Sequence, residues 1–426
     1  MRLDRVDVIE QASFSWERTT GRDAGVWETV ARILEEVRAG GDEALRSLTR
    51  ALDGVDAPLT VPAEAMEAAF HALRPEVREA LARAAARIRR FHEAQLPTDL
   101  VVQGDDGETL EMLWRPLERV GVYAPGGRAA YPSTVLMDVI PAQVAGVRSI
   151  ALVSPPGPDG LPHPAVLAAA HLVGVREMYA VGGAQAVAAL AYGTETIARV
   201  DKIVGPGNVY VATAKRMVMG DVGIDSIAGP TEVVVIADDS ANPAYVAADM
   251  LAQAEHDVEA GAVCLSPARD VLERVHAEIV RQLSTLPRTE IAREALERHG
   301  ALVLVESLDD AVDLANRMAP EHVEIITRDP RRLLDGLRTA GAVFLGPYTP
   351  EPVGDYFAGT NHVLPTHGSA RFSSGLGTLD FMRRMTAATY TAETLARHAR
   401  YIEALADAES LTAHREAVRI RREELR

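Results

Sequence analysis

The stretch that decides the fold is RVGVYAP, residues 119–125, which is followed by Gly126 and Gly127. Its valines and tyrosine predict a short buried strand, and the proline and glycines predict a loop directly after it. The next stretch, STVLMDVIPAQVAGV at residues 133–147, is predicted to be a helix. A strand, a loop and a helix in this order form the first unit of a parallel βαβ fold.

The same alternation continues along the chain in two series. In the first series, further strands are predicted in SIALVSP, EMYAVGG and KIVGPGN, which begin at Ser149, Glu177 and Lys202. The second series starts near Ile227, and each of its strands except the last precedes a helical pattern. Its strands are predicted in EVVVIADD, GAVCLSP, ALVLVES, HVEIITRD and GAVFLGP.

These patterns predict an α/β protein with two tandem Rossmann-like βα arrays, a helical N-terminal region and a helical C-terminal arm. The predicted boundaries are 1–117 for the mainly helical region, 118–226 and 227–366 for the two arrays, and 367–426 for the arm. After about His367 we expect no further strands. The arm has a thin apolar stripe on a polar helix, so we expect it to dock on another surface, that of a partner subunit.

Bulk properties exclude several classes of function. The chain has 426 residues, enough for two or three domains, and a net charge of -17. That charge argues against nucleic acid and against an anionic membrane surface as partners. The N-terminus has no apolar segment typical of a signal peptide, and no run approaches the ~20 apolar residues of a membrane span. The one cysteine, Cys264, fits a reducing cytoplasm and is predicted to be a buried structural thiol.

Several familiar motifs are absent. The chain has no Walker-type phosphate loop, no H-E-x-x-H and no G-x-S-x-G. The dinucleotide pattern G-x-G-x-x-G begins at Gly205 and Gly207, but Tyr210 stands where the third glycine belongs. Spacing alone therefore gives only weak support for a nicotinamide cofactor.

Polar side chains nevertheless follow three strands of the first array. They are Tyr123, Gln185 and Asn208. Because open α/β sheets bind ligands at the carboxyl ends of their strands, these loops could offer backbone N–H groups and helix N-termini to a phosphate. The alternative is that all three are ordinary turn residues.

In the second array the polar motifs fall at the opposite edge of the sheet. AGPTE, QAEHD and APEHVEI each directly precede a strand, so all three lie at the amino edge if the sheet is parallel. The first sheet's carboxyl edge would then face the second sheet's amino edge across a cleft. Within QAEHD, Gln253 and His256 are three residues apart and share one face of a helix, whereas Glu255 lies roughly 200° from Gln253.

Other candidate residues lie in loops and in the arm. Glu321 and His322 are adjacent and form either an acid/base pair or an ordinary polar loop. GDYFAGTNHVLPT, residues 354–366, is predicted to be a long loop and carries Asp355 and His362.

In the arm, Glu409 and His414 would lie ~140° apart on one straight helix. A cap at Ser410 or Thr412 would start a new helix and bring both residues to one side. The alternative is that they are merely solvated. His256, Asp355 and His414 with Gln253 would suit Zn²⁺, but spacing alone does not select them from 12 histidines and 61 acidic residues.

Taken together, the motifs resemble the histidinol dehydrogenase family. The resemblance rests on IDSIAGPTEVVVIAD, DMLAQAEHD, APEHVEI, GDYFAGTNHVLPT and ARFSSGLGTLDFMRR, which occur in the family's order, and on GVYAPGG and VGPGNVYV. It covers nearly the whole chain. His367 departs from the pattern, since a glycine is expected there, and Thr231 is often serine.

The resemblance implies an NAD-linked, zinc-dependent homodimer with one Zn²⁺ per subunit and shared active sites. The family oxidises L-histidinol to L-histidinal and then to L-histidine with two NAD⁺, in the last steps of histidine biosynthesis. Its tail crosses to the partner subunit. Small-molecule chemistry of this kind is consistent with a cytoplasmic enzyme.

The resemblance also implies a role for each motif residue. The implied zinc ligands are Gln253, His256, Asp355 and His414. The implied acid/base pair is Glu321 and His322, and the implied NAD residues are Tyr123, Gln185 and Asn208. The implied substrate residues are Thr231, Gln253, His256, His322, Asp355, His362, Glu409 and His414.

Two other functions compete with this one. A dehydrogenase on the same scaffold could act on another small alcohol, such as a sulfonated diol, but Glu409 and His414 favour histidinol. A non-catalytic zinc or nucleotide sensor would leave Glu321 and His322 without a role.

Overall fold

The computed structural model describes residues 1–16, 23–56, 58–126 and 130–424. The chain divides into two compact units, one of Met1–Gln95 with Leu117–Phe381 and one of Leu96–Pro116 with Met382–Arg426. Among the described residues, every helix is too short or too polar to cross a membrane. The four sequence boundaries given above stay a prediction.

The N-terminal region is mainly helical, as predicted. Its long helix α1 begins after Asp23, whose carboxylate accepts hydrogen bonds from the N–H groups of Gly25 and Val26. One face of α1 is buried against the helices of the first array. The helices are α1 (Ala24–Asp53), α2 (Ala63–Ala72) and α3 (Pro75–Glu93).

The first array is a five-stranded parallel sheet in the order β6-β5-β4-β7-β8. Counted along the chain this order is 3-2-1-4-5, which is the order of a Rossmann-type sheet, and the order reverses between β4 and β7. Its strands are β4 (Arg119–Tyr123), β5 (Ser149–Ser154), β6 (Glu177–Ala180), β7 (Lys202–Val204) and β8 (Gly223–Ile224). Its helices are α4 (Pro132–Ala145), α5 (Pro164–Leu172), α6 (Gly183–Tyr192) and α7 (Val209–Val218).

The second array repeats this order as β11-β10-β9-β12-β13, with β1 added at the edge. All its strand pairs are parallel, and β9, β10 and β12 are buried along their whole length. This burial explains the apolar runs of β9 and β10, whereas β12 also buries Glu324. Its strands are β1 (Val8–Glu10), β9 (Glu232–Ala237), β10 (Gly261–Ser266), β11 (Gly300–Leu304), β12 (His322–Ile326) and β13 (Ala342–Leu345). Its helices are α8 (Pro243–Ala254), α9 (Arg269–Leu283), α10 (Thr289–His299), α11 (Leu308–Met318), α12 (Pro330–Leu334) and α13 (Glu351–Tyr356).

The prediction of two tandem Rossmann-like arrays is therefore confirmed. The sequence missed β1, which is too short to show a periodic pattern, and it missed α10. The prediction of one long loop over residues 354–366 is wrong at its start, because α13 extends to Tyr356.

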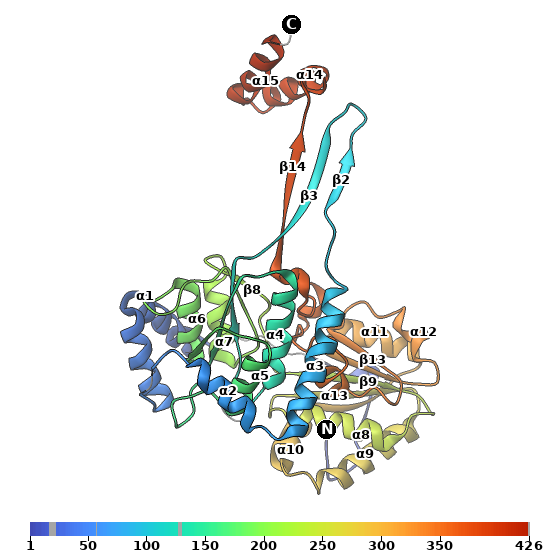
Figure 1. Cartoon of the computed structure of the whole chain (residues 1–426). Coiled ribbons are helices and arrows are strands. Elements are labelled where there is room, and N and C mark those ends of the chain that lie inside the picture. The colour runs from blue at the N-terminus through green and yellow to red at the C-terminus, as the bar shows by residue number, and fades with distance from the viewer. Residues whose placement is uncertain (17–22, 57, 127–129, 425–426) are drawn as a thin grey trace. The chain divides into compact units, whose positions relative to one another are not determined.

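The second unit combines an antiparallel ribbon with two helices (Figure 1). The ribbon has the order β14-β3-β2, and its strands are β2 (Leu100–Gln103), β3 (Thr109–Pro116) and β14 (Met382–Thr389). The helices α14 (Ala392–Ala408) and α15 (Thr412–Glu424) confirm a helical arm. The expectation that no strand follows His367 is wrong, because β14 pairs with β3 along its full length. The sequence also missed β2 and β3, which lie within the region 1–117 predicted to be mainly helical. β2 has an apolar stretch of only three residues, and β14, MRRMTAAT, has no apolar run.

Candidate active site

The three candidate NAD residues lie at the carboxyl edge of the first sheet, as predicted. Tyr123 ends β4, Gln185 lies in the first turn of α6, and Asn208 precedes α7. Tyr123 and Asn208 thus flank the point where the strand order reverses. Gly127, which belongs to the predicted loop after β4, lies outside the described residues.

Each of these side chains has a defined environment. The Tyr123 hydroxyl accepts a hydrogen bond from the N–H of Gly183 at 3.1 Å, and burial raises the pKa of Tyr123 to about 12. Asn208 Oδ1 accepts hydrogen bonds from the N–H groups of Tyr210 and Val211, which caps α7. Gln185 is buried, and its Oε1 has no hydrogen-bond partner among the described residues. The Gln185 oxygen is therefore available to a ligand donor.

Gly205 forms the turn between β7 and Asn208. Its φ is 109°, and a Cβ at this position would lie 2.2 Å from the carbonyl oxygen of Tyr123. Two features therefore exclude a side chain at position 205: the positive φ, and the close contact with the backbone of β4.

We expect Gly205→Ala to lower the melting temperature and to weaken binding of NAD⁺. Gly220→Ala is a matched control, because Gly220 has a φ of 112° but a Cβ added there would meet nothing within 4 Å. Backbone strain of about 1–3 kcal/mol is common to both variants, so the larger loss in Gly205→Ala measures the contact with Tyr123. Equal melting temperatures for the two variants in thermal denaturation would contradict this prediction.

At the second sheet the candidate motifs meet at the amino edge, as predicted. Thr231 directly precedes β9, and His322 is the first residue of β12. His256 lies between the end of α8 and the start of β10. These short connections bring residues far apart in the sequence to one edge of the sheet.

Thr231, Glu321 and Gln253 form a hydrogen-bonded group at this edge. The Thr231 hydroxyl donates to Glu321 Oε2 and accepts from Gln253 Nε2 at 2.7 Å. Glu321 Oε2 also accepts from the N–H of Glu232 at 3.3 Å. Gln253 is fully buried and its Oε1 has no hydrogen-bond partner in the described part of the chain, so this oxygen is oriented to bind a cation or a donor.

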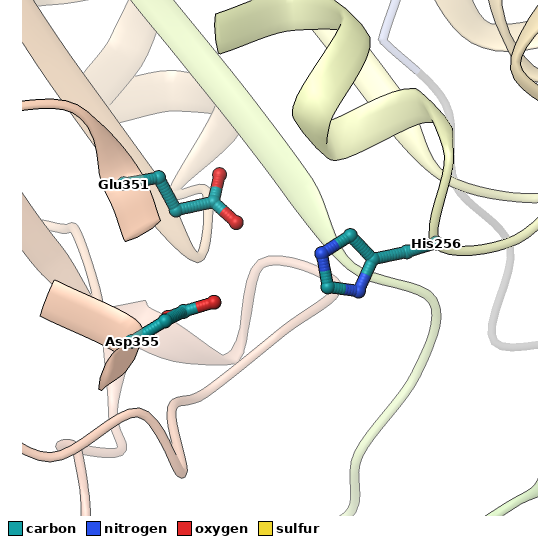
Figure 2. Close-up of side chains that lie close together, drawn as sticks. All are labelled: His256, Glu351 and Asp355. Atoms are coloured by element: carbon teal, nitrogen blue, oxygen red, sulfur yellow. The ribbon is translucent and has the colours of Figure 1, made fainter. Parts of the chain in front are cut away.

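A possible metal site lies beside this group. Three residues, His256, Glu351 and Asp355, each offer one ligand atom, and these atoms all lie within 4.8 Å of one another. Figure 2 shows the imidazole of His256 facing the two carboxyl groups, which project from α13. Sequence reasoning missed Glu351, although it stands four residues before Asp355 and therefore shares a helix face with it.

Several carboxyl groups are buried together at this site, and among the described residues their ion-pair partner is His322 rather than a lysine or an arginine. Burial raises the pKa of Glu321 to about 8 and that of Asp355 to about 7, and it raises the pKa of Glu351 well above its usual range. Grouping carboxylates in the interior is costly unless a cation neutralises them. Together with the unpartnered oxygen of Gln253, this set of imidazole and oxygen donors fits a divalent metal such as Zn²⁺.

His322 lies next to this group as a neutral base. Its Nδ1 lies 3.6 Å from Glu351 Oε2 and 3.8 Å from Glu321 Oε2. Burial, with a smaller contribution from nearby His256, lowers the pKa of His322 to about 3. Neither ring nitrogen has a hydrogen-bond partner among the described residues. A neutral imidazole with a free nitrogen can accept a proton from a ligand.

His362 connects the two arrays. Its Nδ1 donates to the carbonyl oxygen of Asp355 at 3.0 Å, so the neutral ring accepts at Nε2, which lies 3.3 Å from the hydroxyl of Thr134 in α4. Burial lowers the pKa of His362 to about 4. A cavity of about 560 Å³ opens nearby between the arrays. Its lining includes Tyr131 and Leu136 of the first array and His256 and Tyr356 of the second. This cavity confirms a cleft between the two arrays.

Glu409 and His414 lie in the second unit and are exposed. The helix does break between them, since Ser410 has a φ of 60° and the N–H of Leu411 closes the turn onto the carbonyl oxygen of Ala406. Their assignment to the site stays a prediction.

His367 occupies a backbone conformation that favours glycine. Its φ is 53°, which explains physically why a glycine is expected at this position. Its N–H donates to the side-chain oxygen Oε1 of Glu232 at 3.0 Å, which ties this turn to the start of β9.

Cys264 is buried in β10, and burial raises the pKa of its thiol to about 12. A thiol that stays protonated is a poor nucleophile. The prediction of a structural cysteine is confirmed.

Comparisons with known proteins agree with this geometry. The family model for histidinol dehydrogenase matches residues 16–422. The chain is 48% identical over 422 residues to the histidinol dehydrogenase of Halalkalibacterium halodurans, covering 99% of both chains. It is 50% identical over 404 residues to that of Bacillus subtilis, covering 94% of both. The crystal structure of histidinol dehydrogenase from Elizabethkingia anophelis matches with a TM-score of 0.92 and 37% identity, covering 96% of this chain and 95% of the other. The chain therefore belongs to the histidinol dehydrogenase family.

Proposed function

We propose that this chain oxidises L-histidinol to L-histidine through L-histidinal with two NAD⁺, in the last steps of L-histidine biosynthesis. The observation that carries the proposal is the buried group at the amino edge of the second sheet. There a neutral His322 and a Glu321 carboxyl lie 3.8 Å apart beside a possible metal site. Membership of the family supports this reaction for that group.

We infer that one Zn²⁺ per subunit is held by Gln253, His256, Asp355 and His414. The unpartnered oxygen of Gln253 and the grouped donors of His256 and Asp355 support this set, and Glu351 is a further donor at the same place. When bound, Zn²⁺ orients the substrate and polarises its reacting oxygen.

His322 and Glu321 carry the proton transfers in this proposal. His322 is uncharged because it is buried, so its free nitrogen can take the proton of the alcohol. NAD⁺, held by Tyr123, Gln185 and Asn208, accepts the hydride from the alcohol carbon. A cation bound beside Glu321 would lower its pKa, and the Glu321 carboxylate then takes a proton from the water that attacks the aldehyde. The hydroxyl of Thr231 and the N–H of Glu232 hold Glu321 Oε2 in place for that step. The second NAD⁺ accepts a hydride from the resulting hydrate, which gives the carboxylate.

The charge of the site fits a cationic substrate. Histidinol carries an amine and an imidazole, and the site offers the carboxyl groups of Asp355 and Glu321, with Glu409 and His362 as further substrate residues. A sulfonated diol would bring a negative charge to this acidic group. A zinc or nucleotide sensor would not use the pairing of His322 with Glu321.

The first test is turnover of L-histidinol. We expect NADH formation with L-histidinol and none with an anionic diol of similar size, measured by absorbance of NADH. Turnover of the diol alone would support the rival dehydrogenase. Binding of zinc and NAD⁺ without turnover of any alcohol would support the sensor.

We infer that the enzyme is a homodimer with shared active sites. The arm leaves several large apolar side chains exposed, among them Leu405 and Ile420, as expected of a segment that docks on a partner. In this arrangement Glu409 and His414 of one chain complete the site of the other. The cytoplasmic location stays a prediction.

Subunit mixing tests the shared site. Chains with His414→Ala and chains with Glu321→Ala are each expected to be inactive, because each lacks one component of every site. Mixed dimers are expected to regain activity at the one site that receives neither substitution. If mixed dimers form and no activity returns, the sharing of His414 is wrong.

A further inference from the structure

Lys215 and Asp225 form a buried ion pair behind the turn that carries Asn208. Their side chains are 2% and 4% exposed. Among 44 basic residues the chain has only two lysines, Lys202 and Lys215. Burying a lysine charge is costly without a close partner, so its presence at this one interior position calls for a physical reason.

The pair binds both backbone polar groups of Gly205. Lys215 Nζ contacts Asp225 Oδ1 and donates to the carbonyl oxygen of Gly205 at 2.9 Å. Asp225 Oδ2 accepts from the N–H of Gly205 at 2.8 Å. Gly205 has the positive φ described above and stands three residues before Asn208. The pair thus stabilises the one conformation in which this turn passes the end of β4.

The compact ammonium group suits this place. It contacts one carboxylate and one carbonyl oxygen at once, whereas a guanidinium is larger and binds as a planar fork. This difference accounts for a lysine here in a chain that otherwise uses arginine almost everywhere.

Asp138 of α4 is a second carboxyl group in this region, and it is fully buried. Both its oxygens lack a hydrogen-bond partner in the described chain. Burial raises the pKa of Asp138 well above its usual range, the charge of Asp225 raises it further, and Lys215 opposes this rise. Asp225, whose carboxyl group contacts the ammonium directly, is therefore the counterion of Lys215.

We propose that the Lys215–Asp225 pair is a positioning device for the dinucleotide-binding turn, which fixes the Gly205 peptide groups and thereby places Asn208 and the start of α7 for NAD⁺. Neither residue of the pair is assigned a contact with the cofactor. This inference rests on the proposed function, because it assumes that NAD⁺ binds at the carboxyl edge of the first sheet.

The test compares K215M with the double variant K215M/D225N. K215M leaves Asp225 unpaired in the interior and is expected to melt at a lower temperature. The double variant removes both charges and is expected to fold, but nothing then donates to the carbonyl oxygen of Gly205. Loss of a hydrogen bond to a charged group predicts that the Kd for NADH, from fluorescence titration, rises roughly tenfold in both variants. The KM for NAD⁺ should rise in parallel, while the zinc content and the KM for histidinol stay unchanged.

Two matched controls separate positioning from general stability. Lys202 is the first residue of β7 and donates to the carbonyl oxygen of Asp380, so K202M also removes a lysine from this array but should leave the Kd for NADH unchanged. Asp138 forms no hydrogen bond to Gly205 among the described residues, so D138N removes no contact with this turn and should also leave the Kd for NADH unchanged. A folded double variant with the parental Kd for NADH overturns the inference, as does an equal loss in K202M. Absence of NADH binding in the parent chain would instead overturn the proposed function.

Discussion

Replacing His322 by Asn is expected to lower kcat by a factor of about 10²–10⁴, the usual contribution of a positioned general base. Burial keeps the imidazole uncharged, and its free nitrogen is the proton acceptor that the reaction needs. The asparagine amide has a similar size but cannot take up a proton at neutral pH. The KM for histidinol should change little, because the expected loss is in the chemical step.

His276 offers a matched control. It is also a buried histidine, but it lies on α9 and its Nε2 contacts the carbonyl oxygen of Arg2, away from the catalytic group. His276→Asn should keep the parental kcat. A His322→Asn enzyme with parental kcat in steady-state assays would show that another residue is the base.

Replacing His256 by Ala is expected to abolish both zinc binding and activity. The substitution removes the imidazole ligand and leaves only oxygen donors at the metal site. Changing a residue that merely orients a ligand already lowers metal affinity by about 10–100-fold. The loss of a ligand itself should therefore lower the zinc affinity by more than about 100-fold. Dialysis against a weak chelator followed by atomic absorption measures the zinc content. The parent should retain one zinc per chain, and His256→Ala should retain almost none.

His299→Ala is the control for this loss. His299 is paired with Glu259 in the same array but outside the metal group. This variant should keep its zinc and its activity. Retention of one zinc per chain by His256→Ala would place the metal elsewhere.

The sequence predicted both parallel arrays because their strands are buried on both faces. β9 and β10, for example, are buried at every residue, and their central residues, 233–236 and 262–265, are unbroken apolar runs. The predicted strands also predicted the edge at which each motif lies. In a parallel sheet, a loop that follows a strand lies at the carboxyl edge, and a loop that precedes a strand lies at the amino edge. Tyr123, Thr231 and His322 were placed correctly on this basis.

Other features depend on contacts that a local pattern does not record. The ribbon strand β14 is mostly exposed, and its stability comes from antiparallel pairing with β3, far away in the sequence. Glu351 joins the metal group because α13 packs beside β12, and Asp225 reaches the N–H of Gly205 because β7 and β8 are neighbours. The zinc ligands, NAD residues and substrate residues came from the family resemblance, since spacing left their alternatives open.

The central claim is a four-electron oxidation of histidinol at one zinc-dependent site. The most direct measurement is the stoichiometry of the zinc-loaded parent enzyme with limiting L-histidinol and excess NAD⁺. We predict two NADH and one L-histidine for each L-histidinol, and complete loss of turnover after zinc is removed by a chelator. No NADH, or turnover that stops at one NADH per histidinol, would contradict the account.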